Sequence, residues 1–413
     1  MPAFSGRSQV IRRVQRFERF VLLILDGVGI GEMPDAGAWG DLGSDTLGNL
    51  LAAEKPELPN LQRLGLGNIR ALPNLPAAPA PEGSFGKAAI LSNGKDTSVG
   101  HWEIAGVVTA APFPTYPAGF PERILEPFRR AIARDVLGNK PASGTEIIDE
   151  LGEEHMRSGR PIVYTSGDSV FQIAAHEEIV PIEELYRMCG IARQLLDGPD
   201  RVARVIARPF LGEPGNFHRT GNRRDFAIPP PETTLLDLMK DKGLAVIGVG
   251  KVPSIFDGRG FTESVSAHGN AEVLDGTIRA LHAAGCGIVF SNLVDFDMLW
   301  GHRNDAHGYA GGLEEFDRRL PELRAAMNAG ECLIITADHG CDPTTASTDH
   351  TREYVPILAC GRGAGTGVDL GIRKTMADIG QTIAENFGLR LRNGQSFLAD
   401  LQAARPPACA RRR

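Results

Sequence analysis

The chain has 413 residues, of which 42% are hydrophobic and 23% charged, a composition typical of a soluble globular protein with room for more than one domain. Its formal net charge of −7 argues against bulk binding to nucleic acid. No apolar run approaches the roughly 18 residues that a membrane-spanning helix needs, so we expect no membrane partner.

The two ends of the chain differ in composition from the rest. Residues 1–19 carry five arginines against the single acid Glu18 and lack the apolar core of a secretory signal, so we expect a basic, disordered extension. Residues 402–413 are rich in proline and arginine and predict a disordered tail. The 6 cysteines show no Cys-x-x-Cys pair and no regular spacing, which favours a reduced, cytoplasmic setting.

Two proline-rich segments divide the remaining chain. Residues 112–119 are rich in turn-forming residues, and residues 228–231 form a stiff Ile-Pro-Pro-Pro boundary. We therefore predict a cap domain at 113–231, inserted into a core metal-binding domain made of residues 20–112 and 232–401.

Strands and helices alternate through the core. Strands are predicted at 20–25, 244–249, 286–294, 331–336 and 355–359. Helices are predicted at 232–242, 270–284, 311–329 and 374–387. In the cap, strands are predicted near 161–164 and 201–207 and a helix near 183–197. The alternation predicts an α/β sheet with helices on both faces, a fold that places ligands beyond the carboxyl ends of its strands.

Aspartate and histidine side chains follow three of the predicted core strands. They are Asp26 after 20–25, Asp297 and His302 after 286–294, and Asp338 and His339 after 331–336, with His350 in the loop that follows. A lone aspartate at a strand end is usually a turn or a helix cap, but here the same chemistry recurs at three strand ends. Carboxylate and imidazole together suit divalent transition metals, and this many ligands suits two ions. His307, in the same polar loop as His302, competes for that role from further along the chain.

A pair of hydroxyl residues lies between glycines in the stretch Gly94–Glu103. Two metals about 3.5–4 Å apart can activate an oxygen nucleophile and hold a phosphoryl group, so Thr97 or Ser98 is a candidate nucleophile. The plainer interpretation is a helix N-cap. Residue chemistry alone does not separate Thr97 from Ser98.

The cap sequence carries groups that suit a phosphorylated sugar. Arg208, Arg223 and Arg224 offer planar guanidinium forks that can bond two phosphate oxygens at once, although a solvated, ion-paired loop would also explain any one of them. Lys251 ends a predicted core strand, where it could meet the cap. Asp168 could accept hydrogen bonds from sugar hydroxyls, or could simply form a turn.

Several longer motifs resemble the prokaryotic phosphopentomutase family, part of the alkaline phosphatase superfamily. The motifs are Asp26–Gly31, Gly94–Thr97 with Gly100–Glu103, Asn292–Asp297, Thr336–Gly340 and Asp349–Pro356 in the core, and 138–146 and 174–178 in the cap. The likeness covers roughly residues 20–400. It implies an alkaline-phosphatase-like core sheet with an inserted α/β cap. It also implies an isomerase that interconverts ribose 1-phosphate and ribose 5-phosphate, and the 2-deoxyribose pair, through a bisphosphate intermediate.

The resemblance also implies roles for individual residues. Two Mn²⁺ ions would bind, one to Asp26, Asp338, His339 and the Thr97 oxygen, and the other to Asp297, His302 and His350. Thr97 rather than Ser98 would carry the phosphoryl group, after priming by glucose 1,6-bisphosphate or ribose 1,5-bisphosphate. Contacts with the small sugar phosphate carry over to Ser166, Asp168, Val170, Arg208, Arg223, Arg224 and Lys251. We expect a monomer.

The chain departs from the family pattern at three positions. Gly27 stands where many relatives have serine, and Arg224 stands where some have histidine, which leaves the role of Arg224 open. Cys341 stands where asparagine is common, and its sulfur could be a ligand or an oxidation site beside the metals.

Other activities share parts of this pattern. Another phosphatase of the alkaline phosphatase superfamily, or a cofactor-independent phosphoglycerate mutase, would use similar metal ligands, but the cap matches the phosphopentomutase family. A non-catalytic protein that binds polyanions through its basic termini would leave the ligands and the nucleophile without a role.

Overall fold

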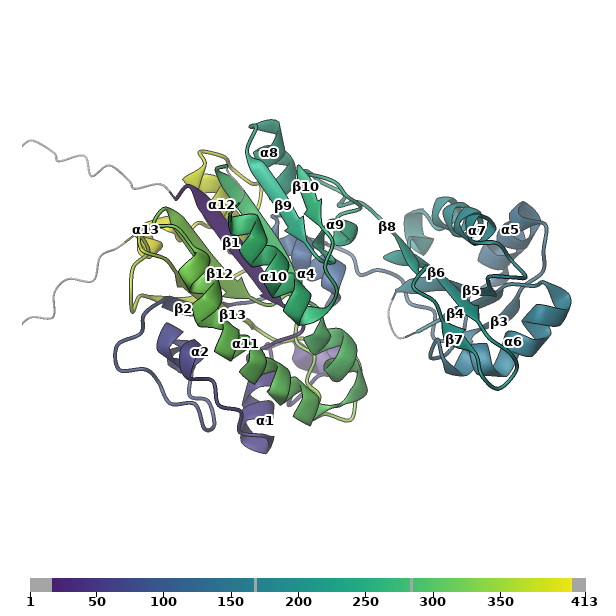
Figure 1. Cartoon of the computed structure of the whole chain (residues 1–413), viewed down its shortest axis with the longest axis horizontal. Coiled ribbons are helices and arrows are strands. Elements are labelled where there is room, and N and C mark those ends of the chain that lie inside the picture. Colours follow the sequence, from purple (N-terminus) through teal and green to yellow (C-terminus); the bar gives the residue numbers. More distant parts are fainter. Residues whose placement is uncertain (1–16, 167–168, 283–284, 403–413) are drawn as a thin grey trace, which may run out of the picture.

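A computed structural model of the chain describes residues 17–166, 169–282 and 285–402. Two sheets of unequal size form two bodies that lie side by side (Figure 1). No helix in these ranges is both long and apolar enough to cross a membrane.

The larger body is built on an eight-stranded sheet in the order β10-β9-β11-β1-β12-β13-β2-β14. Its strands are β1 (Arg19–Leu25), β2 (Ser84–Ala88), β9 (Ala245–Val249), β10 (Glu263–Val265), β11 (Gly287–Leu293), β12 (Glu331–Thr336), β13 (Val355–Cys360) and β14 (Asp369–Arg373). β1 lies between β11 and β12 and is parallel to both, and every residue of these three strands is buried. Such continuous burial is expected of parallel strands that are covered on both faces. β13 runs antiparallel to β12 and β2, so the sheet is mixed.

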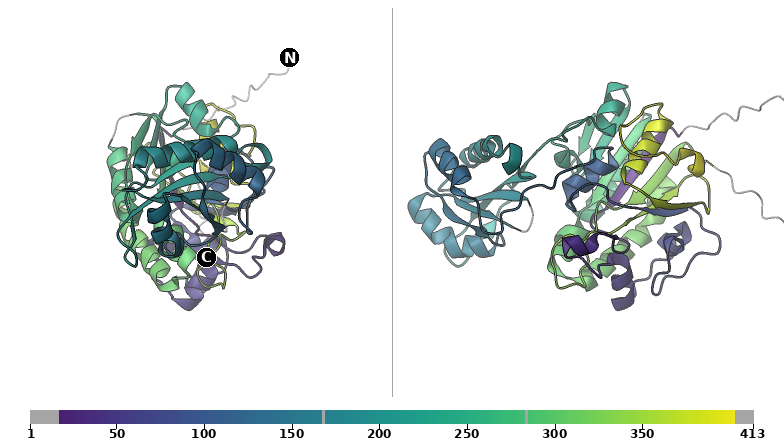
Figure 2. Two further views of the ribbon diagram at one scale, coloured as in Figure 1. Left: turned by 90° about the vertical axis from the view of Figure 1, so that its right-hand side faces the viewer. Right: turned by 180° about the vertical axis from the view of Figure 1, so that it is seen from behind.

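Helices cover both faces of this sheet, which confirms the predicted α/β architecture. One layer contains α1 (Thr46–Ala53), α2 (Pro59–Leu64), α3 (Leu66–Ile69), α10 (Gly269–Leu281) and α11 (Ala306–Ala326), with α10 and α11 in front in Figure 1. The other layer contains α4 (Thr97–Ile104), α8 (Leu235–Asp241), α9 (Val252–Ile255), α12 (Ala377–Asn386) and α13 (Leu398–Leu401), and faces the viewer in the reverse view of Figure 2.

The smaller body contains a second sheet in the order β3-β4-β5-β6-β7, with β8 also paired to β6. Its elements are α5 (Glu122–Ile132), β3 (Leu137–Pro141), α6 (Glu146–Ser158), β4 (Ile162–Thr165), β5 (Val170–His176), α7 (Ile182–Leu195), β6 (Arg204–Leu211), β7 (His218–Arg219) and β8 (Arg224–Ala227). Alternate side chains of β4 enter different cores: Val163 packs with α5 and α7, whereas Ile162 and Tyr164 pack with α6. All these elements lie within 113–231, the segment that we assigned to a cap, and we call this body the cap.

Tertiary contacts and caps shift several predicted boundaries. α11 begins at Ala306 rather than at residue 311, because Asp305 caps the first turn by accepting a hydrogen bond from the N–H of Gly308 at 2.8 Å. α8 begins after Thr234, which forms a capping box with Asp237.

Residues 17–19, which we assigned to the disordered extension, belong instead to the core. Phe17 is buried, and its N–H donates to Oδ1 of Asn386 at 2.8 Å. Arg19 is the first residue of β1. The rest of the predicted extension, 1–16, and residues 403–413 of the predicted tail lie outside the described residues.

Candidate metal centre

The predicted metal ligands converge because their strands are neighbours. β11, β1 and β12 are adjacent and parallel, so their carboxyl ends meet at one edge of the sheet. Asp26 directly follows β1, and Asp338 and His339 follow β12. Asp297 lies in a π-helical turn (Phe296–Trp300) shortly after β11. π-turns of this kind are frequent at functional sites.

The candidate ligands form two groups, within each of which the nearest ligand atoms lie within 4.8 Å of one another. The groups are Asp26, Asp338 and His339, and Asp297, His302 and His350. They adjoin each other, since the rings of His339 and His350 have centroids 3.9 Å apart. These are the same two sets that the family resemblance implies. His307, the competing ligand, is 94% exposed and instead pairs with Glu54 at 3.2 Å.

The donor atoms are arranged as a metal ion would require. Oδ1 of Asp26 lies 3.4 Å from Nε2 of His339, and Oδ1 of Asp297 lies 3.1 Å from Nε2 of His350. Neither of these two buried carboxylate oxygens accepts a hydrogen bond from the described residues. Each oxygen therefore lies close to an imidazole nitrogen without forming a hydrogen bond to it. Buried polar atoms without partners are rare unless something else binds them. Both groups therefore fit a divalent cation.

Backbone carbonyls orient two of the imidazoles. Nδ1 of His302 donates to the carbonyl of Thr348 at 2.6 Å, and Nδ1 of His339 donates to that of Gly340 at 3.1 Å. A proton on Nδ1 leaves the Nε2 lone pair free for a metal, and such bonds fix the orientation of the ring.

Burial and crowding perturb the titration of these groups. Burial, together with the charges of Asp338 and Asp297, raises the pKa of Asp26 above its usual range. Burial alone would lower the pKa of His339, but the carboxylates of Asp338 and Asp26 outweigh it and raise this pKa to about 10. Burial opposes ionisation of Asp297, yet His350 and His302 hold its pKa well below the usual range. The concentrated negative charge would attract cations, which would replace the proton on His339.

The candidate nucleophile lies at the start of α4. Asp96 caps this helix by accepting hydrogen bonds from the N–H groups of Ser98 and Val99, so neither hydroxyl residue is needed as the cap. Oγ1 of Thr97 lies 3.3 Å from Nε2 of His339, and Thr97 lines the pocket beside the metal ligands. Ser98 does not line that pocket. The geometry thus favours Thr97 between the two hydroxyls that residue chemistry left open.

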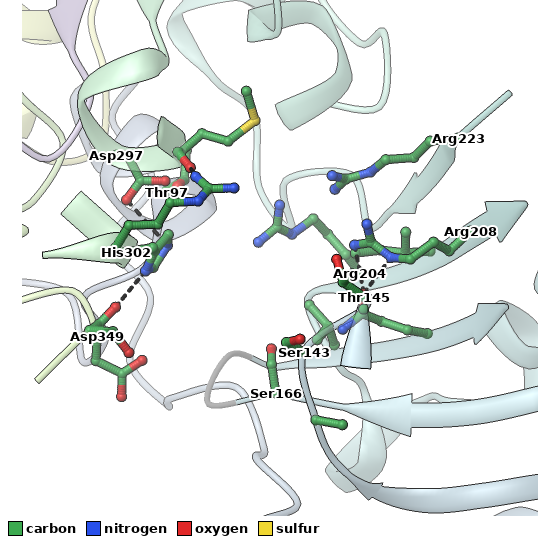
Figure 3. Close-up of a pocket in the computed structure, with 18 of the residues that line it drawn as sticks. Thr97, Ser143, Thr145, Ser166, Arg204, Arg208, Arg223, Asp297, His302 and Asp349 are labelled. Carbon is green, nitrogen blue, oxygen red and sulfur yellow. Dashed lines mark hydrogen bonds and ion pairs between the residues drawn. The ribbon is translucent and has the colours of Figure 1, made fainter. Parts of the chain in front are cut away.

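A cavity of about 510 Å³ lies between the core and the cap. Figure 3 shows Thr97, Asp297 and His302 on its core side, facing Arg204, Arg208 and Arg223 on its cap side. Five of the predicted substrate contacts line this cavity: Ser166, Val170, Arg208, Arg223 and Lys251. Asp168, a sixth, lies outside the described residues.

Arg224 is not at this cavity, contrary to our prediction. Its guanidinium lies over the rings of Tyr186 and Phe226, at 5.2 Å and 4.9 Å from their centroids. Side chains of neighbouring residues in an extended segment point to opposite faces, so Arg223 can line the pocket while Arg224 cannot.

Sequence reasoning missed several residues that line the cavity. Arg204 and Ile206 lie on β6 with Arg208, at every second position, and all three face the cavity. That two-residue period was visible in the sequence and would have identified Arg204. Oε1 of Gln172 accepts hydrogen bonds from Nε and Nη2 of Arg208 and holds the guanidinium in place. The loop 143–145 also lines the cavity, just before α6; it lies within the family-like motif 138–146, to which we had assigned no contact.

The chain is similar to several known proteins. Residues 18–391 match the family model of the metalloenzyme superfamily. The chain is 56% identical over 386 residues to a phosphopentomutase of Desulfitobacterium hafniense, covering 93% of this chain and 100% of that protein. It is 57% identical over 374 residues to a phosphopentomutase of Clostridium kluyveri, covering 90% and 96% of the two chains. A solved Leishmania mexicana phosphoglycerate mutase is 14% identical, with a TM-score of 0.47 and coverage of 93% and 98%.

Proposed function

The chain belongs to the metalloenzyme superfamily and is an enzyme of the phosphopentomutase family, and on that premise we propose that it interconverts ribose 1-phosphate and ribose 5-phosphate, together with the 2-deoxyribose pair. One observation carries this proposal. Thr97 and the candidate metal ligands Asp297, His302 and His350 form one wall of a pocket whose opposite wall carries the guanidiniums of the cap.

Two manganese ions would occupy the two ligand groups. Asp26, Asp338 and His339, with the Thr97 oxygen, would hold one ion, and Asp297, His302 and His350 would hold the other. When bound, such a pair of ions neutralises charge on a transferring phosphoryl group and lowers the pKa of the attacking or leaving oxygen.

Thr97 acts as the carrier of the phosphoryl group. Phosphorylated Thr97 gives its phosphoryl group to the free hydroxyl of the pentose phosphate: the bond from Oγ1 to phosphorus breaks, and a bond from the sugar oxygen forms. The resulting bisphosphate turns over in the pocket and returns its other phosphoryl group to Thr97. Glucose 1,6-bisphosphate or ribose 1,5-bisphosphate supplies the first phosphoryl group.

The cap binds the part of the substrate that does not react. Arg208 and Arg223 hold the phosphate that is not transferred, since their positive charges line the cap wall opposite the metals, and Lys251 lines the same pocket from the core. Asp168, outside the described residues, would bind sugar hydroxyls, and Ser166 would contact the substrate from the pocket wall. Enclosure between core and cap limits loss of the phosphoryl group to water.

Two further properties complete this proposal. We propose a reduced, cytoplasmic setting, in which the described cysteines would stay thiols. We further propose a monomer as the working unit.

The test is a coupled assay of ribose 1-phosphate conversion to ribose 5-phosphate, with manganese and a trace of glucose 1,6-bisphosphate. Thr97→Ala should lose turnover while keeping its metals, and Ser98→Ala, one residue along the same helix, should keep both. Full turnover by Thr97→Ala would refute the assignment of the nucleophile. Free phosphate as the product would identify a phosphatase instead. Formation of 2-phosphoglycerate from 3-phosphoglycerate would identify a cofactor-independent phosphoglycerate mutase.

A further inference from the structure

One buried carboxylate near the metal centre has no part in the chemistry above. Glu353 has no exposed surface, and both of its oxygens are fully engaged. Oε2 accepts hydrogen bonds from the N–H groups of Gly31 at 3.1 Å and Thr46 at 2.9 Å. Oε1 accepts from the hydroxyls of Thr46 at 2.7 Å and Thr351 at 2.6 Å. Four bonds to one buried carboxylate hold its surroundings in a single arrangement.

Two of the bonded residues, Gly31 and Thr351, lie in loops that carry metal ligands, and the third, Thr46 at the start of α1, bonds to such a loop. Gly31 lies in the loop after β1 that begins with Asp26. The hydroxyl of Thr46 accepts a hydrogen bond from the N–H of Cys341 at 3.2 Å, which extends the network to the loop after β12 that holds Asp338 and His339. Thr351 follows His350 directly and pairs through its backbone with Gly340, at 2.7 Å and 3.1 Å.

Two glycines leave the space that this carboxylate occupies. A Cβ at Gly29 would lie 2.6 Å from the carboxyl carbon of Glu353, and a Cβ at Gly340 would lie at the same distance. Both loops therefore pack directly against the carboxylate through their backbones, so a change at Glu353 would be transmitted to both.

We propose that Glu353 is a positioning residue that holds the loops after β1 and β12 in the arrangement at which Asp26, Asp338 and His339 face one metal ion. The proposal rests on the metal centre proposed above. All three ligands of that site are carried by loops in the network. In the second group, Asp297 and His302 follow β11 instead, and only His350 neighbours the network, so the second group depends less on Glu353.

The test measures metal binding and not turnover. Manganese is titrated into metal-free protein, followed by calorimetry and by electron paramagnetic resonance, for wild type, Glu353→Ala and Glu353→Gln. Loss of an outer partner of metal ligands typically lowers affinity about 10- to 100-fold, and we expect such a loss in Glu353→Ala at the site of Asp26, Asp338 and His339. Glu353→Gln keeps the shape of the side chain and one accepting oxygen, so its manganese affinity should lie between those of wild type and Glu353→Ala.

A matched control is available in the core. Asp317 is also fully buried and accepts hydrogen bonds from the N–H groups of Asn60 at 3.0 Å and Leu61 at 2.7 Å, at the start of α2. Asp317→Ala removes a comparable set of bonds away from the metal ligands, so it should lower the melting temperature and leave manganese affinity unchanged. Thr46→Val, which removes only the bridging hydroxyl, should weaken the same metal site as Glu353→Ala and serves if that variant does not fold.

Each outcome bears on the proposal. The proposal would be overturned if the Glu353 and Thr46 variants bound manganese at both sites as tightly as wild type. It would also be overturned if Asp317→Ala lost as much manganese affinity as the Glu353 variants. Selective weakening of the site of Asp26, Asp338 and His339, with partial rescue by glutamine, supports it. Wild-type protein that binds two manganese ions but lacks mutase turnover would refute the proposed reaction while leaving this inference intact.

Discussion

Replacing Gly100 with alanine tests whether catalysis depends on the close approach of α4 to the end of β12. A Cβ at this position would lie 2.8 Å from both the carbonyl carbon and the Cβ of Asp338, and closer still to its carbonyl oxygen. Ordinary contact distances between carbon atoms are about 3.5–4.0 Å, so helix and strand end must separate by about 1 Å. Misplacement of about 1 Å can reduce a rate about 100-fold, because reacting atoms must be held in near-attack geometry.

We therefore expect Gly100→Ala to lower kcat about 100-fold with manganese saturating. The KM for ribose 1-phosphate should change little, because the cap and its guanidiniums are untouched. Overpacking of this kind also costs about 1–3 kcal/mol of stability, so the melting temperature should fall by several degrees.

The assay is steady-state mutase kinetics, with thermal unfolding of the same preparations. Gly190→Ala in α7 is the control, since a Cβ there would meet nothing within 4 Å. Alanine favours a helix over glycine by about 1 kcal/mol, so this control should be neutral or slightly stabilising. A kcat for Gly100→Ala within about threefold of wild type would refute the reasoning, because the required displacement should cost far more.

Three further predictions concern phosphate binding, metal binding and pH. Arg208→Ala should raise the KM for ribose 1-phosphate about 10- to 100-fold, which corresponds to the loss of a hydrogen bond to a charged group. Arg224→Ala should leave this KM unchanged. Equal effects of the two substitutions in steady-state kinetics would contradict the placement of the two side chains. His302→Ala should weaken manganese binding, measured by calorimetry, whereas His307→Ala should not. If only His307→Ala weakened binding, His307 rather than His302 would be the ligand. Because the pKa of His339 is raised to about 10 in the metal-free protein, metal must displace its proton, so manganese affinity should rise about tenfold per unit between about pH 6 and pH 8. An affinity that is constant across that range would show that metal binding releases no proton, and would refute the raised pKa of His339.

Local patterns in the sequence were enough to predict five of the eight core strands, four of the core helices and the candidate ligands that follow three of those strands, but not β2, β10, β14 or the shorter helices. The reason is that apolar period and strand length are properties of short segments, and parallel strands present their carboxyl ends at one edge. Asp26, Asp297 and Asp338 could therefore be grouped although they are far apart in the chain. Five of the substrate contacts that the family resemblance implied also lie at one pocket.

Contacts between distant segments decided the rest. Residue types alone did not distinguish Thr97 from Ser98; in the structure, Asp96 rather than either hydroxyl residue caps α4. Residue types also left His307 as a competitor of His302; in the structure, His307 pairs with Glu54. The direction in which Arg224 points depends on where its extended segment starts its alternation, and this is why Arg224 was misplaced. Glu353 could be predicted only as part of a motif, because three of its four hydrogen bonds come from Gly31 and Thr46, which are far from it in the chain. A sequence specifies which groups can bond, whereas only packing of the whole chain determines which of them meet.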